Sequence, residues 1–166
     1  MILGLAGWSG SGKTTLVSNL IPELKKINVS VSTLKHAHEG FDIDTPGKDS
    51  YVHRESGAKE VLISSNKRFA LMHEYINEET SLKSLIKKLS PVDLILVEGW
   101  KKENIKKIEI YRKEINKPLL YNNDINIVAI ATNDKSIKIK NMTILDLNDY
   151  EKIAKFICKL IKKEKI

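Results

Sequence analysis

Apolar stretches alternate with helical patterns along the chain, which predicts parallel β-strands joined by α-helices. Ile2–Ala6 and Val29–Leu34 are apolar stretches of strand length. Between them, Thr14–Ile27 carries a leucine at every fourth residue, which is the spacing of one face of a helix. The opening segment therefore predicts a strand, a helix and a second strand.

Three later apolar stretches predict further strands of the same sheet. Val92–Glu98 is nearly continuously apolar, as expected of a central parallel strand covered on both faces, and Ile108–Tyr111 and Ile125–Ala131 are shorter strands. The last predicted helix has Asn148 as its N-cap, with Glu151 three residues further on. The apolar face of this helix consists of Ile153, Phe156, Ile157, Leu160 and Ile161.

The middle of the chain departs from this alternation. Residues 35–48 show no periodicity and predict a loop whose length is more often functional than idle. A short helix is expected over Asp49–Gly57. Glu60–Ser64 and Arg68–His73 then flank a Ser-Asn-Lys turn, which predicts an inserted β-hairpin.

One more helix is expected over Glu78–Leu89, with Asn77 as its cap and Pro91 ending it. The sequence shows no internal repeat and no domain linker. It therefore predicts a single α/β domain over residues 1–166, with a doubly wound, mostly parallel sheet flanked by helices.

Composition narrows the classes of function. The net charge is +7, but the lysines are spread over predicted helix faces, so an anionic small ligand or an acidic partner is expected rather than nucleic acid. No apolar run approaches the roughly 20 residues that cross a bilayer, and no secretory signal follows Met1. The single cysteine, Cys158, lies beside the apolar face of the last helix and indicates a core thiol in a reducing compartment, the cytoplasm.

The segment between the first strand and the first helix matches the phosphate-binding pattern G-x-x-x-x-G-K-[ST], the Walker A motif. Glycines let the backbone wrap a pyrophosphate, and backbone N–H groups with the positive end of the helix face its oxygens. Lys13 is expected to reach the β and γ oxygens, Thr14 to bind Mg²⁺, and Thr15 to support the α-phosphate. The loop residues are Gly7, Trp8, Ser9, Gly10, Ser11, Gly12, Lys13, Thr14 and Thr15. We therefore predict a purine nucleoside triphosphate bound with magnesium.

Three acidic residues are candidates for the metal and for catalysis. Glu98 ends an apolar strand and would project at the carboxyl edge of a parallel sheet, where it orients magnesium or its waters, unless it merely terminates the strand. Asp42 and Asp44 lie in the long loop and are candidates to reach magnesium or to position an attacking water, with a solvated loop as the alternative. Lys13, Asp42 and Asp44 are the candidate catalytic residues.

The long loop also contains His36 and His38, which admit a zinc site or, alternatively, hydrogen-bonded loop anchors. Its Lys35-His36-Ala37-His38 is followed by Phe41-Asp42-Ile43-Asp44-Thr45-Pro46-Gly47-Lys48-Asp49-Ser50. Further matching segments are the phosphate loop, His53-Arg54 with Ser56-Gly57-Ala58, Ser65–Met72, Leu94–Lys101, and Lys107-Ile108-Glu109 with Arg112. Together these segments resemble the molybdopterin-guanine dinucleotide biosynthesis adapter proteins, MobB. The resemblance extends to about Asp149. Glu39 stands where the family often has a second histidine.

The resemblance implies a homodimeric GTP-binding protein with weak GTPase activity. Such proteins assist the guanylyltransferase that joins GMP to molybdopterin in molybdenum cofactor biosynthesis, and proteins that carry molybdopterin are further candidate partners. It implies nucleotide contacts from Trp8–Thr15 and Asp42, and less specifically from Leu71, Met72, His73 and Glu74. Magnesium would be held by Thr14 with Glu98 or Asp44. Asp134, after the strand predicted at 125–131, faintly echoes the guanine-binding aspartate of GTPases.

Other functions stay open from the residues alone. A small ATP-dependent metabolite kinase would use the same loop, but it usually adds an arginine-rich lid over the transferred phosphate. This chain has three arginines, Arg54, Arg68 and Arg112. A GTPase for nickel insertion would need a cluster of cysteine and histidine, whereas Cys158 is isolated. With no obvious arginine finger in cis, we expect slow hydrolysis at most.

Overall fold

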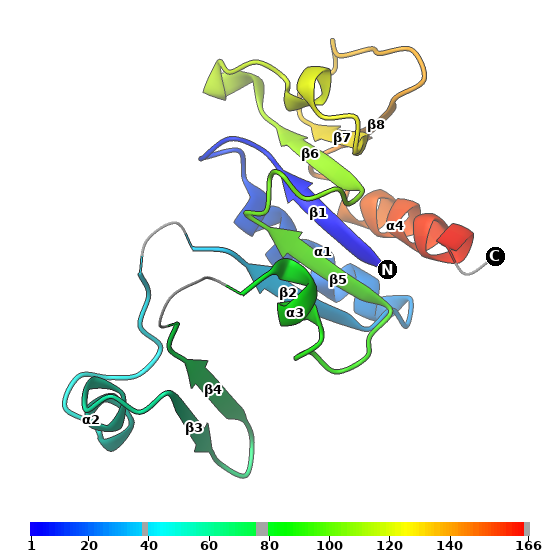
Figure 1. The fold of residues 1–166 in the computed structure, drawn as a ribbon. Helices are drawn as coiled ribbons and strands as arrows, with labels where there is room; N and C mark the ends of the chain where they lie inside the picture. Colours follow the sequence, from blue (N-terminus) through cyan, green and yellow to red (C-terminus); the bar gives the residue numbers. More distant parts are fainter. Residues whose placement is uncertain (38–39, 76–79, 165–166) are drawn as a thin grey trace. The chain divides into compact units, whose positions relative to one another are not determined.

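The computed structural model describes residues 1–37, 40–75 and 80–164. The chain divides into two units: unit 1 comprises Met1–His36 and Ser90–Ile166, and unit 2 comprises Ala37–Leu89. Both units are drawn in Figure 1. The expectation of one nucleotide-binding domain over residues 1–166 stays a prediction.

A six-stranded sheet forms the centre of unit 1 (Figure 1). Its strands run in the order β2-β5-β1-β6-β7-β8, and every neighbouring pair is parallel. The parallel α/β sheet predicted from the apolar stretches is confirmed. The strands are β1 (Ile2–Ala6), β2 (Val31–Lys35), β5 (Leu94–Glu98), β6 (Lys107–Tyr111), β7 (Ile127–Thr132) and β8 (Thr143–Asp146).

The edge strand β8 was not predicted. It has four residues, and its two inner residues are only half-buried, so its sequence lacks the continuous apolar run of a central strand. It pairs with β7 from Ala129 to Thr132. β8 is therefore a strand mainly because it pairs with β7, and the pattern of its own residues contributes less.

One face of the sheet packs against α1 (Lys13–Lys26) and α4 (Tyr150–Glu164), which Figure 1 shows behind the strands. The leucines at every fourth position of α1 are buried, as the periodicity predicted. Burying each such side chain contributes about 1.5–3 kcal/mol. Cys158 is half-buried and packs against the same core, as expected. This core includes Leu3, Leu5, Leu16, Leu20, Leu24, Ile108, Ile110, Ile153, Ile157 and Ile161.

The N-cap predicted for α4 was wrong by one residue. The side chain of Asp149 accepts a hydrogen bond from the backbone N–H of Lys152 at 3.0 Å. The backbone N–H of Asn148 instead donates to the carboxylate of Asp146 at 2.9 Å, which places Asn148 in the preceding turn. The predicted partner Glu151 forms an ion pair with Lys155.

The opposite face of the sheet carries the chain that follows β6, with two short 3₁₀ turns, η1 (Lys113–Ile115) and η2 (Leu120–Asn123). Because side chains alternate along a strand, Lys107 and Glu109 point to this face while the isoleucines of β6 face the helices. Both polar side chains are buried. Among the described residues, none of the helices has the length and apolar composition needed to span a lipid bilayer.

Unit 2 contains the predicted hairpin and two short helices. β3 (Glu60–Ser64) and β4 (Phe69–His73) form an antiparallel two-stranded sheet, which confirms the hairpin. The short helix predicted from residue 49 is α2 (Asp49–Glu55). The loop predicted before it spans the described residues between β2 and α2.

The helix predicted over Glu78–Leu89 is shorter than expected. α3 spans Leu82–Ile86, and the hydroxyl of Ser81 caps it by accepting from the backbone N–H of Ser84. A serine directly before the helix supplied this cap, so the helix begins later than the acidic residues suggested. It ends before Pro91, and the predicted cap Asn77, with Glu78, lies outside the described residues.

Candidate nucleotide-binding site

The predicted phosphate loop connects β1 to α1 at the carboxyl edge of the unit 1 sheet. In the sheet, β1 lies between β5 and β6. The chain runs from β1 to β2, which lies beyond β5, whereas β6 lies on the other side of β1. Strand order therefore reverses around β1, and in open parallel sheets ligands bind outside the carboxyl ends of strands at such a point. The fold places the loop where a ligand is expected.

The backbone of the loop adopts conformations that glycine favours. Gly10 and Gly12 have φ of 78° and 91°, in the left-handed region. Gly12 is the N-cap of α1, no side chain caps the helix, and its first turn holds no acidic residue. The N–H groups at the start of α1 are therefore not blocked by a side chain, and together with the helix dipole they are suited to an anion.

The ammonium group of Lys13 lies against the loop. It donates to the carbonyl oxygens of Gly7 and Trp8, each at 2.9 Å. Burial lowers the pKa of Lys13 from its ordinary value, nearby Glu98 opposes this effect, and Lys101 and Lys35 add to it. The charges of Glu98 and Lys101 therefore act on Lys13 at the edge of the sheet that carries the loop.

The two magnesium candidates of unit 1 also lie at this edge. Glu98 ends β5 and stands beside Leu5 of β1 in the sheet register, and Thr14 is exposed in the first turn of α1. A hydroxyl and a carboxylate are oxygen ligands of the kind that Mg²⁺ prefers. These residues fit a magnesium ion bound together with phosphate oxygens.

The predicted acids of the long loop meet an arginine within unit 2. Arg54 donates to the carboxylate of Asp42 at 2.9 Å and to that of Asp44 at 3.2 and 3.3 Å. The side chain of Asp44 is fully buried, whereas that of Asp42 is 60% exposed. A magnesium ion would have to compete with the guanidinium for Asp44, while Asp42 keeps a solvent-facing surface.

The remaining predicted nucleotide contacts, Leu71–Glu74, also belong to unit 2. Leu71 lies in β4 and is 43% exposed. His73 is hydrogen-bonded through Nδ1 to Glu60 at 2.6 Å, and Glu74 lies 3.9 Å from Arg54. The predicted site residues therefore form two groups, the phosphate loop with Glu98 in unit 1 and the surroundings of Arg54 in unit 2.

No group of three or more histidine, cysteine, aspartate or glutamate side chains that could hold a metal occurs in the part of the chain that the structure describes. The ring of His36 lies 5.1 Å from that of Trp100. The other histidine of the pair, His38, lies outside the described residues together with Glu39. In unit 1, Asp134 accepts from the backbone N–H and hydroxyl of Ser136 at 2.9 and 2.6 Å, so it closes a local turn.

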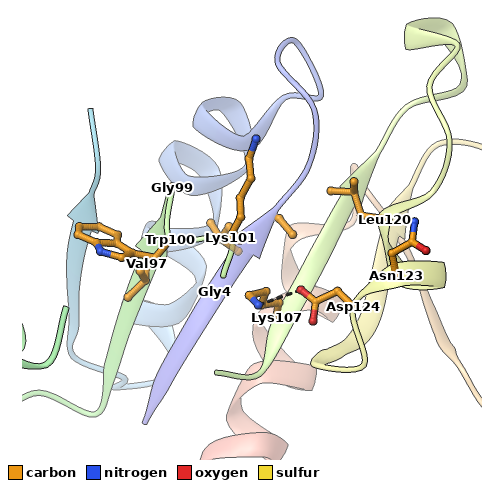
Figure 2. A pocket seen from close by; sticks show the side chains of 11 residues that line it. Gly4, Val97, Gly99, Trp100, Lys101, Lys107, Leu120, Asn123 and Asp124 are labelled. Atoms are coloured by element: carbon orange, nitrogen blue, oxygen red, sulfur yellow. Dashed lines mark hydrogen bonds and ion pairs between the residues drawn. The ribbon is translucent and has the colours of Figure 1, made fainter. Parts of the chain in front are cut away.

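A cavity of about 180 Å³ opens on the sheet face away from α1 and α4 (Figure 2). Small residues of β1, Gly4 and Ala6, contribute to it, and Trp100 and Lys101 line it from the segment after β5. Figure 2 shows the ion pair between Lys107 and Asp124 on this face.

The family profile described as "Molybdopterin guanine dinucleotide synthesis protein B", MobB, matches residues 2–133. The chain belongs to the MobB family. Its match includes the phosphate loop, the long loop, the hairpin and β6.

Two named proteins with similar sequences support membership of the MobB family. The molybdopterin-guanine dinucleotide biosynthesis adapter protein of Haemophilus influenzae is 42% identical, over 94% of this chain and 86% of the relative. The protein of the same name from Escherichia coli is 39% identical, over 98% and 94%.

A crystal structure of molybdopterin-guanine biosynthesis protein B has a TM-score of 0.77 and 27% identity, covering 98% of this chain and 99% of that one. A MobB homologue from Bacillus stearothermophilus, at 19% identity and a TM-score of 0.72, covers 98% of each chain and shows the same fold.

One residue beside the loop was missed as a candidate for the site. In the sequence, Arg112 appeared in the MobB resemblance and as one of three arginines, but not as a candidate site residue. In the structure its Nε donates to the carbonyl oxygen of Ser11 at 3.2 Å, across 101 positions of sequence. Its place directly after β6 was the available signal, because strand ends at the carboxyl edge supply ligand-site residues.

Proposed function

We propose that this MobB-family protein binds GTP with Mg²⁺ at its phosphate loop and acts as an adapter in molybdopterin-guanine dinucleotide biosynthesis. One observation carries the nucleotide proposal. The start of α1 has no side-chain cap, and the ammonium group of Lys13 lies on the loop that precedes it. An uncapped helix N-terminus beside a cation is suited to a polyphosphate.

The adapter proposal follows from family membership and from the names of the relatives. Both curated relatives are called molybdopterin-guanine dinucleotide biosynthesis adapter proteins. The partner we propose is the guanylyltransferase that joins GMP to molybdopterin, in the cytoplasm, with molybdopterin-carrying proteins as further partners. The protein would act through a nucleotide-dependent complex rather than through fast turnover.

In this proposal Thr14 binds magnesium, with Glu98 holding the ion or one of its waters. Lys13 neutralises the β and γ oxygens of the nucleotide. Asp42 and Leu71–Glu74 of unit 2 would contribute further contacts to the nucleotide, and Asp44 would join the metal only by exchanging Arg54 for it. Hydrolysis is slow at most, because the ion pairs of Arg54 engage that arginine with carboxylates.

The exposed apolar residues of unit 2 support a homodimer. Phe69 is 72% exposed, Leu62 is 60% and Leu71 is 43%, and Leu62 stands directly opposite Leu71 in the hairpin. Phe41 and Ile43 of the long loop are 74% and 57% exposed. An isolated two-stranded hairpin is marginally stable in water, so a second copy covering this surface would stabilise both.

Isothermal titration with GTP and with ATP, each with magnesium, tests the nucleotide proposal. The wild-type protein should bind GTP more tightly than ATP, and Lys13→Ala should abolish binding while its melting temperature stays unchanged. Lys162→Ala, at the exposed end of α4, is the matched control and should bind like the wild type. Unchanged affinity in Lys13→Ala would refute the assignment. A clear preference for ATP would favour a metabolite kinase instead.

A further inference from the structure

We propose that Arg112 is a positioning residue of the phosphate loop, which it holds in the anion-binding conformation from outside. The inference rests on the proposed nucleotide site and adds a residue to it. Arg112 follows β6 directly, and β6 is a neighbour of β1, so the guanidinium comes to the loop from the adjacent strand.

The hydrogen bond to Ser11 shows on which side of the loop Arg112 acts. Its Nε donates to the carbonyl oxygen of Ser11 at 3.2 Å. In a phosphate loop successive N–H groups face the anion. The carbonyl oxygens of Gly7 and Trp8 accept from Lys13, whereas that of Ser11 accepts from Arg112. Arg112 therefore contacts the outer side of the loop, and its role differs from that of an arginine finger, which touches the transferred phosphate.

Gly12 makes this contact sterically possible. A Cβ atom built on Gly12 would lie 3.1 Å from Nε and 3.3 Å from a terminal nitrogen of Arg112. The guanidinium thus packs closely on the backbone of the residue that caps α1. Because this backbone supplies the first N–H groups of the helix, Arg112 supports the part of the loop that faces the β-phosphate.

A second hydrogen bond ties the loop to the same segment of chain. The indole Nε1 of Trp8 donates to the carbonyl oxygen of Pro118 at 2.8 Å. The ammonium group of Lys117 lies 5.9 Å from the centre of the Trp8 ring. Two residues of the loop, Trp8 and Ser11, are therefore both bonded to residues 112–118.

A buried carboxylate holds the far end of that segment. Glu109 of β6 is completely buried and accepts from the backbone N–H groups of Leu120 and Tyr121 at 2.7 and 3.0 Å. The segment from Arg112 to Tyr121 is thus bonded to β6 at its far end and to the phosphate loop at Arg112 and Pro118. This arrangement gives Arg112 a defined position from which to support the loop.

Titration of GTP and GDP, each with magnesium, into Arg112→Ala tests the proposal. Losing a charged hydrogen bond to the loop should weaken both nucleotides by about tenfold to a hundredfold. The two factors should be equal, because the supported N–H groups cradle the β-phosphate that both nucleotides carry. Arg112→Lys keeps the charge but not the position of Nε, so it should recover only part of the affinity. Arg68→Ala, in the hairpin turn, is the matched arginine control and should bind like the wild type.

The possible results separate the explanations. Equal affinity in wild type and Arg112→Ala would overturn the inference, and so would a loss for GTP with GDP unaffected, which would indicate a γ-phosphate contact. If Arg112→Ala melts at a lower temperature without nucleotide, Arg112→Lys replaces it, because that change keeps the charge and most of the side chain but not the position of Nε. Arg112→Lys should weaken GTP and GDP equally, by about two- to fivefold, and unchanged affinity would again overturn the inference. A wild-type protein that binds neither nucleotide would instead refute the proposed function.

Discussion

Lys107 and Asp124 form an ion pair on the sheet face away from α1 and α4, with 2.8 Å between Nζ and Oδ2. The side chain of Lys107 is 4% exposed and that of Asp124 is 23% exposed. The lysine therefore depends more on its partner than the aspartate does, because water reaches the aspartate.

This asymmetry predicts unequal costs for the two single substitutions. Asp124→Asn leaves a buried ammonium group without its counter-ion and should lower the free energy of unfolding by about 2–4 kcal/mol. Lys107→Met leaves a carboxylate with access to water and should cost about 1–2 kcal/mol. Urea unfolding of both variants measures the difference, and a larger loss in Lys107→Met would contradict this account.

The same ion pair makes the free energy of unfolding depend on pH in the acid range. Burial opposes ionisation of Asp124, but the hydrogen bond and charge of Lys107 and the N–H of Asn126 hold its pKa below the ordinary value. In acid the unfolded chain therefore takes up a proton first, so this contribution is present above about pH 4 and is lost as pH falls further. The slope of unfolding free energy against pH below pH 4 should be shallower in Asp124→Asn.

Glu109, which lies on the same strand as Lys107, gives the free energy of unfolding the opposite dependence on pH. Burial raises its pKa, although the N–H groups of Leu120 and Tyr121 oppose the effect. Its folded form thus keeps a proton longer than the unfolded chain, and this contribution to stability is lost as pH rises above about 4.3 through the raised pKa. Carbon NMR of the Glu109 carboxyl group should show a midpoint above about 4.3, the ordinary value of a glutamate. A midpoint at or below that value would contradict the burial argument.

The exposed apolar surface of the hairpin predicts how the oligomer responds to charge. Leu62→Asp places a carboxylate in the surface proposed to be covered by a second copy, so the protein should become monomeric by light scattering. Ile125→Asp is the matched control, because Ile125 is 97% exposed in unit 1 and lies outside the hairpin. A dimer that persists in Leu62→Asp, or one lost equally in both variants, would count against the hairpin interface.

The two aspartates bound to Arg54 should differ in importance for unit 2. Asp44 is buried and bonded to two nitrogens of Arg54, whereas Asp42 is exposed and bonded to one. Asp44→Asn should therefore increase cleavage within residues 37–89 by added protease, whereas Asp42→Asn should change it little. Similar protection in the two variants would show that burial of Asp44 does not stabilise unit 2.

The strand and the helix that flank the proposed phosphate loop could be predicted because their signal is local. A strand, a glycine-rich turn and a helix with leucine at every fourth position follow one another within the first 26 residues, and each element formed within about two residues of its expected bounds. The hairpin was predicted for the same reason. Its two strands are separated by a turn of four residues, so no distant partner is needed to define them.

Features that depend on contacts between residues far apart in the sequence could not be predicted from local patterns. Arg112 meets Ser11 only because β6 lies beside β1, and sequence pattern alone does not give strand order. β8 likewise depends on β7. The predicted cap of α4 was wrong for a different reason, since the adjacent polar residues Asn148 and Asp149 are equally suited to capping and the local turn decides between them.

The contacts that support the phosphate loop can form only late in the synthesis of the chain. The loop is synthesised among the first fifteen residues, but its bonds to Arg112 and Pro118 join it to residues 101 and 110 positions later. A nascent chain that has not yet emerged from the ribosome as far as β6 lacks both of them. In the proposed function, tight nucleotide binding therefore requires the chain through Pro118, although the proposed binding motif emerges first.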